Sequence, residues 1–236
     1  SCAIDFYFTP VSAEISSNII RNCPNGIKLD SGGFYIENNE ITGCANYAIN
    51  DHGSYYYNSY SPNSLIDKNI IVRCGAGISL SNFEGTLTCN TFRDCRDFGF
   101  ASSRDQRSSS QLRIRGNLFN NCSRPTDKWN AAVVVTCIND NAISVEDNDF
   151  VDNRGMAIWA SGMVAIDNNR INGSRLGILL YRSSYPGTVE NNIISGGITG
   201  IDLGCQADVV SNKISDVAEG IRLSVDTISR SESYIA

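Results

Sequence analysis

The chain has 236 residues, of which 42% are hydrophobic and 19% are charged, and its formal net charge is −6. This composition is typical of a globular protein with one sizeable core, and an acidic balance without a Lys/Arg run excludes a nucleic-acid partner. No apolar stretch is long enough to span a bilayer, so we expect no membrane partner, and this chain shows no signal peptide.

Asparagine is unusually frequent, at 26 residues, and nine of these recur at intervals of 20 to 31 residues. Each of the nine has an aliphatic residue three positions before it and an Ile or Phe two positions after it. A small residue followed by an apolar one comes later in each unit, as in Gly26-Ile27 and Ala48-Ile49. The recurring positions are Asn18, Asn39, Asn69, Asn90, Asn117, Asn148, Asn169, Asn192 and Asn212.

A repeat of this length, with apolar residues at every second position and no helical periodicity, predicts a β-solenoid. We expect an all-β fold in which residues 1–236 form a single right-handed parallel β-helix domain. It would have about nine to ten coils of about three short strands each, stacked about 4.8 Å apart. Ile and Phe would fill the interior, and each turn asparagine would bond its amide to the asparagine of the next coil. We attribute the choice of asparagine to its tolerance of the left-handed conformation.

The spacing lengthens between residues 39 and 69, 90 and 117, and 117 and 148, where we expect surface loops. Residues 3–6 match the middle of a repeat unit, and the last residues begin a further one. Because open solenoid ends expose strand edges, we expect a longer chain with flanking domains, or a homotrimer.

Nine cysteines are present, and five of them follow a repeat asparagine by five residues: Cys23, Cys44, Cys74, Cys95 and Cys122. Stacked cysteines lie within reach of a disulfide, but their parallel Cβ directions suit a bridge poorly. We therefore expect small side chains packed inside a turn, with disulfides as the alternative. A single histidine and the lack of zinc-type spacing predict no metal site and no cofactor. Calcium binding at Asp147-Asn148-Asp149 is an alternative, although we prefer a structural role in a turn for these residues.

Candidate site residues come directly after the small–apolar pair of each coil and alternate with inward-facing residues. His52 has Tyr47 five positions before it and Lys28 one coil below, which supplies a base, an acid and a cation for proton abstraction beside a carboxylate. A solvated surface imidazole is the alternative for His52. The outward strip begins with Asp5, Tyr7, Lys28, Asp30, Asn50 and His52, has Arg104 and Arg107 nearby on a loop, and becomes apolar at Val134, Trp159 and Leu179.

The segment Tyr47-Ala48-Ile49-Asn50-Asp51-His52 resembles the Tyr-Gly-Phe-Asp-Pro-His motif of the alginate (mannuronan) C5-epimerases, which are parallel β-helices of the pectate-lyase-like kind. Lys28-Leu29-Asp30 resembles the Lys-x-Asp pair that this family carries on an earlier coil. The resemblance implies that His52 and Tyr47 transfer protons at C5 of a uronate, with Lys28 beside its carboxylate. Asp30 and Asn50 complete the implied catalytic set, and Arg96 lies one residue out of register with a later arginine of the family.

For substrate binding we expect Tyr7, Asp5, Tyr55, Tyr56, Arg96, Arg104 and Arg107. The tyrosines would stack on sugar rings, or pack onto the rod. The preferred function is thus a carbohydrate-active β-helix whose partner is an acidic polysaccharide, with C5 proton abstraction leading to epimerisation or β-elimination.

Two other functions stay open. Asp5 and Asp30 suit a glycoside hydrolase in carboxylate spacing. A function of another class is a non-catalytic structural or receptor-binding module of a phage tail spike or adhesin, in which Trp159 would lie in an inter-subunit contact. A polysaccharide substrate favours an extracellular or virion-surface location.

Overall fold

The computed structural model describes residues 2–6, 13–29, 33–51, 61–104, 111–124, 130–137, 143–181, 186–224 and 234–235. Throughout these ranges the elements are β-strands, and every pairing between the strands is parallel. Within them no helix of a length and apolarity suited to crossing a membrane occurs. The predicted all-β parallel solenoid is therefore confirmed.

Each coil contributes three strands. The first strands form a ten-stranded sheet, and the second and third strands form a seventeen-stranded sheet in which two long strands run through the turn between them. The first strands are β2 (Ala13–Ser16), β5 (Phe34–Glu37), β8 (Ser61–Asp67), β11 (Phe83–Thr88), β14 (Leu112–Arg115), β17 (Ile143–Glu146), β20 (Val164–Asp167), β23 (Gly187–Glu190), β25 (Ala207–Val210) and β27 (Tyr234–Ile235). The second strands are β3 (Ile19–Arg21), β6 (Glu40–Thr42), β9 (Ile70–Val72), β12 (Thr91–Arg93), β15 (Leu118–Asn120), β18 (Asp149–Val151) and β21 (Arg170–Asn172). The third strands are β1 (Cys2–Asp5), β4 (Asn25–Leu29), β7 (Tyr47–Asp51), β10 (Ala76–Ser81), β13 (Phe100–Arg104), β16 (Ala131–Cys137), β19 (Met156–Ser161) and β22 (Leu176–Tyr181), and the two long strands are β24 (Ile193–Gly204) and β26 (Lys213–Leu223).

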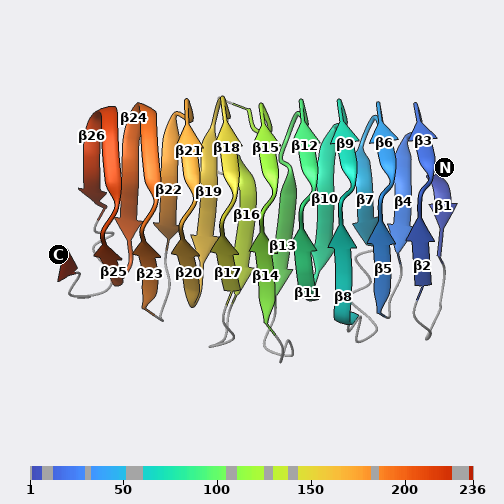
Figure 1. Ribbon diagram of the computed structural model, residues 1–236, viewed down its shortest axis with the longest axis horizontal. Helices are drawn as coiled ribbons and strands as arrows, with labels where there is room; N and C mark the ends of the chain where they lie inside the picture. The colour runs from blue at the N-terminus through green and yellow to red at the C-terminus, as the bar shows by residue number, and fades with distance from the viewer. Residues whose placement is uncertain are drawn as a thin grey trace.

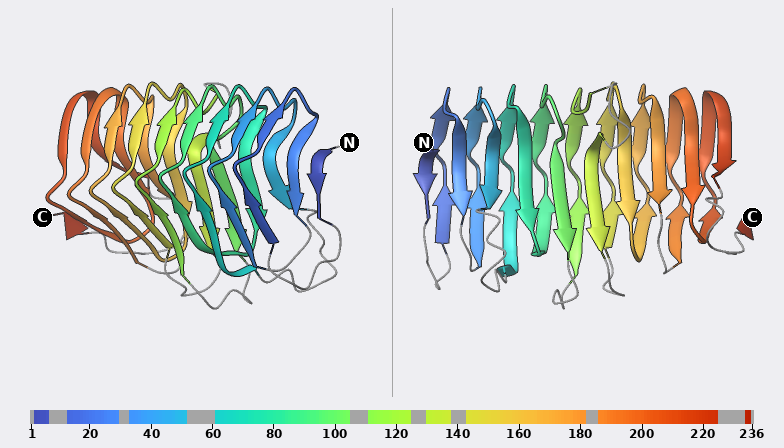
Figure 2. Two further views of the ribbon diagram at one scale, coloured as in Figure 1. Left: turned by 45° about the vertical axis from the view of Figure 1, so that its right-hand side comes forward. Right: turned by 180° about the vertical axis from the view of Figure 1, so that it is seen from behind.

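The coils wind in a right-handed sense. In Figure 1 the first and second strands climb the front of the rod, and the third strands descend behind them while the chain advances from its N-terminal to its C-terminal end. Figure 2 shows the third strands from behind. The nine repeat asparagines span eight complete turns, slightly fewer than the coil number that the repeat predicted.

The asparagine ladder, made of the nine repeat asparagines, forms the bend between the first and second strands, as predicted. Asn69 shows the pattern: its backbone N–H and its Nδ2 both donate to Oδ1 of Asn90, at 2.8 and 3.0 Å. Nδ2 also donates to the carbonyl oxygens of Asp67, at 3.1 Å, and Ile36, at 2.8 Å. Each buried amide thus closes its own bend and joins it to both neighbouring coils.

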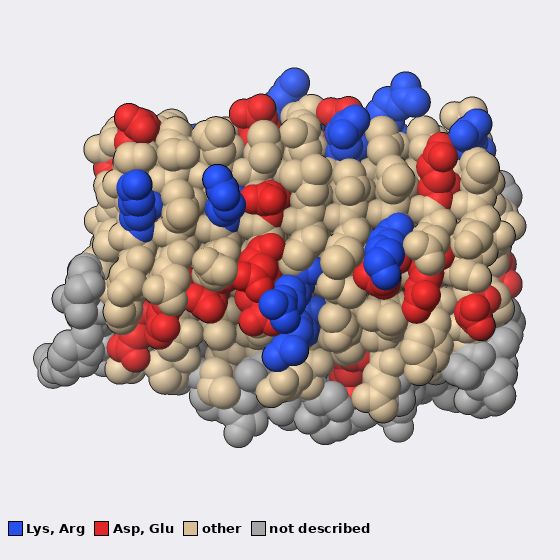
Figure 3. All heavy atoms as spheres, in the orientation of Figure 1, with Lys and Arg blue, Asp and Glu red and all other residues tan. Residues whose placement is uncertain are grey.

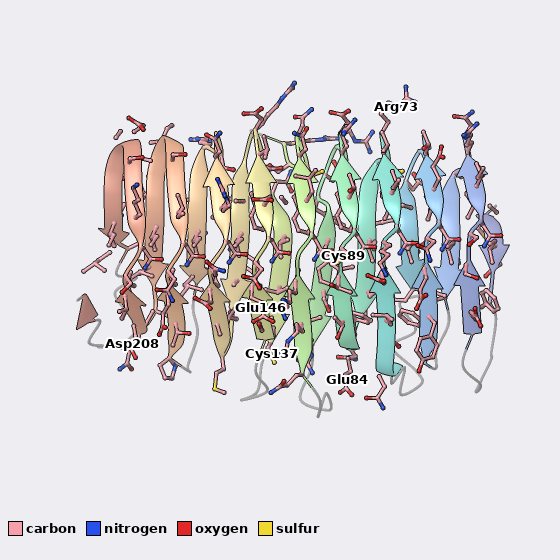
Figure 4. The ribbon with its side chains drawn as sticks, in the orientation of Figure 1. Arg73, Glu84, Cys89, Cys137, Glu146 and Asp208 are labelled. Atoms are coloured by element: carbon pink, nitrogen blue, oxygen red, sulfur yellow. The ribbon has the colours of Figure 1, made fainter. Side chains whose placement is uncertain are left out.

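The left-handed residue of this bend precedes the ladder asparagine, so our explanation for the choice of asparagine was wrong. Lys68 and Cys89, each one position before a ladder residue, have φ values of 53° and 54°. A second left-handed residue, such as Arg73 at 54°, precedes the cysteine position of each coil. In Figure 4, Cys89 lies at the bend of the front face and Arg73 at the upper edge. The ladder asparagine is required for its inward-facing amide, because the change of direction occurs one residue earlier.

Stacked apolar side chains fill the rod. Phe119 stacks on Phe92 with ring centroids 4.8 Å apart and on Phe150 at 5.0 Å. The small residues expected before the inward Ile are required by close approach of neighbouring coils: a Cβ on Gly77 would lie 2.0 Å from the carbonyl oxygen of Gly99. The core thus fixes which side chains of the third strands point outward.

Candidate functional site

The third strands align the predicted site residues on their outer face. Asp5 pairs with Lys28, and Lys28 pairs with Asn50, in three adjacent coils. This register continues through every later coil, as the sequence columns predicted. The outer column comprises Asp5, Lys28, Asn50, Ser79, Ala101, Val134, Trp159, Leu179, Asp202 and Arg222.

At the N-terminal end of the outer column, a half-buried lysine lies beside a fixed amide. Lys28 stands between the buried side chains of Ile27 and Leu29, so its ammonium is directed away from the core. Asn50 donates from Nδ2 to the carbonyl oxygen of Asp51 at 2.9 Å. Asp51, the last residue of β7, accepts the backbone N–H of Ser81 from the next coil. This end of β7 is therefore tied to its neighbour directly before His52.

Six of the predicted site residues lie outside the described residues: Tyr7, Asp30, His52, Tyr55, Tyr56 and Arg107. Their assigned roles stay predictions.

Tyr47 lies at the opposite end of β7 from Asp51. Its ring packs against that of Phe98, two coils further on, with centroids 6.4 Å apart and planes inclined by 45°. Ala76, the residue of the intervening coil that pairs with Tyr47, is small enough to leave room for this contact. Across β7, at about 3.3 Å per residue, the Cα atoms of Tyr47 and Asp51 are about 13 Å apart.

Arg96 lies in a charged cluster at the turn before β13. It is exposed, and its Nε lies 3.4 Å from Asp97 Oδ1. Arg124 of the following coil approaches the same oxygen at 2.9 Å. Two guanidinium groups thus share one carboxylate, which leaves this corner with a net positive charge near Phe98.

Arg104 is not on a loop, so its predicted contact with substrate was wrong. It is the last residue of β13, only 1% exposed, and its guanidinium lies 3.9 Å from the buried carboxylate of Glu84. The alternation of β13 places Phe100, Ser102 and Arg104 on the inner side. A buried guanidinium cannot reach a ligand on the outer face.

The thiol column comprises Cys23, Cys44, Cys74, Cys95 and Cys122 and lies at the turn between the second and third strands. These cysteines are free thiols without a disulfide, which agrees with the packing role that we preferred for them. Cys122 Sγ donates to the carbonyl oxygen of Asn120 at 3.2 Å, the same local bond that ladder asparagines make. A hydrogen bond with Cys122, reinforced by burial, holds the pKa of Cys95 well above its usual value. Likewise, a hydrogen bond with Cys74 raises the pKa of Cys44. These thiols are packing groups of the turn.

A second polar and aromatic cluster follows further along the outer face. Trp159 and Tyr181 have ring centroids 6.4 Å apart, and Arg222 donates from Nε to Asp202 Oδ2 at 3.0 Å. All four side chains stand at outward positions of the third strands, and the predicted site includes neither Asp202 nor Arg222. Their adjacency in successive coils was the signal for an ion pair.

The front face of the rod carries paired charges. Arg115 Nε lies 3.0 Å from Asp147 Oδ2, and Arg113 Nε lies 3.0 Å from Glu146 Oε1. In Figure 3 basic and acidic side chains are interspersed over this face. Asn148 points into the ladder between Asp147 and Asp149, so these three side chains do not converge on a cation. Among the described residues no group of three His, Cys, Asp or Glu side chains is placed to hold a metal ion.

The register, the winding and the stacked interior define a right-handed parallel β-solenoid. The family model described as "Right handed beta helix region" matches residues 3–171, and the chain belongs to this family. A second family model, "Periplasmic copper-binding protein (NosD)", matches residues 124–233. No curated protein matches the chain, and no solved structure matches it.

Proposed function

We propose that this protein binds an acidic polysaccharide along the outer column and abstracts the C5 proton of a uronate unit with His52. The observation that carries the proposal is the alignment of Asp5, Lys28 and Asn50 in adjacent coils. These three residues form the N-terminal end of the outer column. Asn50 stands two residues before His52, the single histidine.

Binding would use the repeat of the rod itself. Rungs about 4.8 Å apart have a spacing comparable to that of successive pyranose units in an extended polysaccharide. Lys28 offers a point charge to a uronate carboxylate, and Asn50 and Ser79 offer hydrogen bonds on the following rungs. Arg96, with the positive corner that it forms beside Arg124, would attract a polyanion to the same part of the rod.

The chemistry would begin with transfer of the C5 proton to the His52 imidazole, whose ordinary pKa suits a base near neutral pH. The electron pair of the C5–H bond moves into the C5–C6 bond, and the enediolate oxygens carry the charge beside Lys28. In epimerisation Tyr47 returns a proton to the opposite face of C5, and solvent restores both side chains. In β-elimination the pair instead forms the C4–C5 double bond, and the 4-oxygen leaves with a proton.

The test is the exchange of the C5 proton of polymannuronate, followed by NMR in deuterated water. We expect exchange with the wild type, its loss with His52→Ala and a large decrease with Lys28→Gln. Lys213→Gln is the matched control, because Lys213 is an exposed lysine in the second-strand part of β26. No exchange with the wild type, or equal exchange with His52→Ala, would contradict the proposal.

Copper does not enter this proposal. The family model that matches residues 124–233 is named for periplasmic copper binding. Within the described part of that segment, no three His, Cys, Asp or Glu side chains converge, and the single histidine of the chain lies outside the segment. The donor set does not fit a copper centre. The name supports only a location outside the cytoplasm, which a polysaccharide substrate also requires.

A second candidate function is a non-catalytic receptor-binding module that associates as a trimer. The observation in its favour is the apolar run of Val134, Trp159 and Leu179 in the outer column, which a partner copy would cover. Light scattering tests it: a trimer that loses its association in Trp159→Lys supports the module, and a monomer contradicts it.

A further inference from the structure

We propose that Trp159 and Tyr181, together with Arg222, form a second sugar subsite that binds the neutral ring face of a pyranose. This inference rests on the proposed polysaccharide function and adds a place and a binding mode to it. The subsite lies in β19, β22 and β26, whose third-strand portions are seen from behind in Figure 2.

The two rings stand on a rigid base. Trp159 and Tyr181 are half-buried, while their strand neighbours Ala160 and Leu180 are buried in the core at 0% and 1% exposure. The rings are inclined by 35° to one another, and Leu179 extends the apolar surface beside them, paired with Trp159. A broad apolar surface made by aromatic faces is suited to the C–H face of a pyranose.

Polar groups border the rings on the C-terminal side. Asp202 is paired with Leu179 in one direction and with Arg222 in the other. Asp202 accepts hydrogen bonds from Arg222 and from Ser224 Oγ, and Arg222 also donates to Glu219 Oε2 at 3.3 Å. Arg222 remains 46% exposed while these bonds fix its position. Its remaining N–H groups are available to the hydroxyls of a following sugar unit, because Arg222 stands three rungs beyond Trp159.

The charge of this border provides no attraction for a uronate carboxylate. Asp202 and Glu219 together outweigh Arg222 by one negative charge, whereas the other subsite centres on the cation of Lys28. The two subsites therefore recognise different parts of the polymer: Lys28 recognises a carboxylate, and the rings recognise a pyranose ring irrespective of its charge.

The distance between the subsites sets the length of the ligand. Trp159 is the fifth rung after Lys28, which corresponds to about 24 Å along the axis. Only an oligosaccharide of several units spans both, and such a ligand gains from the high effective concentration of its second end. A trisaccharide is too short to engage both subsites together.

Fluorescence of Trp159 provides the test. The chain has two tryptophans, so Trp129→Phe leaves Trp159 as the single reporter. We expect polymannuronate to change this emission. In titrations of polymer binding, Trp159→Leu with Tyr181→Leu should weaken polymer affinity roughly three- to tenfold, because the stacking contribution is lost while the side chains stay apolar. Tyr35→Leu is the matched control, since Tyr35 is 42% exposed on the other sheet.

Salt separates the two contributions. The loss caused by the double leucine variant should be the same at low and high ionic strength, whereas the loss caused by Lys28→Gln should shrink as salt screens the charge. Unchanged polymer affinity in the double variant, together with weaker binding by Lys28→Gln, would overturn the second subsite and leave the proposed function standing. A wild type that binds no polymer by either measurement would overturn both.

Discussion

Asn153 takes the place that Cys122 holds in the preceding coil, and its Oδ1 accepts the backbone N–H of Cys122 at 2.8 Å. Its Nδ2 donates to the carbonyl oxygen of Phe119 at 3.0 Å. The thiol column thus continues as an asparagine at the same turn, with the amide joining two coils in the manner of the asparagine ladder. The bend of the asparagine ladder and the turn of the thiol column can thus be closed by the same chemistry.

This equivalence predicts that Cys122→Asn is tolerated. The new amide would accept the N–H of Cys95 and extend the bonds that Asn153 already makes, so the free energy of unfolding should change by less than about 1 kcal/mol. Cys122→Leu has no such bonds and overpacks the turn, at a cost of about 1–3 kcal/mol. Urea denaturation compares the two variants. Equal losses of stability would contradict the equivalence of the columns.

Asn90 in the middle of the asparagine ladder should be one of the most costly positions to truncate. Its Nδ2 donates to Ile66 at 2.9 Å and to Thr88 at 2.8 Å, and its Oδ1 accepts two bonds from Asn69. Asn90→Ala leaves several buried groups without partners, so we expect a loss of roughly 2–4 kcal/mol by urea denaturation.

The control for this prediction is Asn212→Ala at the C-terminal end of the ladder. Asn212 is partly exposed, so water replaces the lost bonds and the expected loss is about 1 kcal/mol. If Asn90→Ala and Asn212→Ala lowered the free energy of unfolding by the same amount, burial of the amides would not be the source of the ladder's stability.

The fold was predictable because its determinants repeat. Nine asparagines with the same apolar neighbours fix the coil, the register and the inward side chains, and the outer column of the structure is the column read from the sequence. Residue type predicts most of the left-handed positions, which carry Asn, Asp or Gly, but it does not predict Lys68, Arg73 and Cys89. They follow from the position in the coil, which constrains whatever residue stands there.

Arg104 shows where residue type misleads. A segment rich in Ser and Arg indicated an exposed loop, yet Phe100, Ser102 and Arg104 share one face of β13, and Phe100 belongs to the core. Strict alternation would have placed Arg104 inside. Burial of a paired charge is too rare to be expected from composition, whereas the periodicity of the strand does predict it here.

The buried pair of Arg104 and Glu84 yields a prediction about stability. Arg104→Met removes the cation and leaves the Glu84 carboxylate buried, so we expect a loss of about 3–5 kcal/mol. Glu84→Leu combined with Arg104→Met should recover most of this loss, because neither charge remains. Urea denaturation measures both variants.

The exposed pair of Arg21 and Glu40 is the matched control. Arg21→Met removes an ion pair at the surface, where the two side chains are 57% and 42% exposed, and should cost less than about 1 kcal/mol. If Arg104→Met cost no more than this, or if the double variant were as unstable as the single one, the charges would not be coupled in the interior.

The raised pKa of Cys95 predicts a loss of stability at alkaline pH. A hydrogen bond with Cys122 and burial keep the folded thiol protonated, while the unfolded thiol ionises near its ordinary pKa of about 8.5. Above this pH the unfolded state binds fewer protons, so the stability that Cys95 contributes is complete below about pH 8.5 and falls by about 1.4 kcal/mol by pH 9.5. Urea denaturation across this range should show the slope, and Cys95→Ala should remove this contribution, whereas Cys89→Ser, at an exposed thiol, should keep it. A Cys95→Ala variant with the full alkaline slope would show that another group titrates.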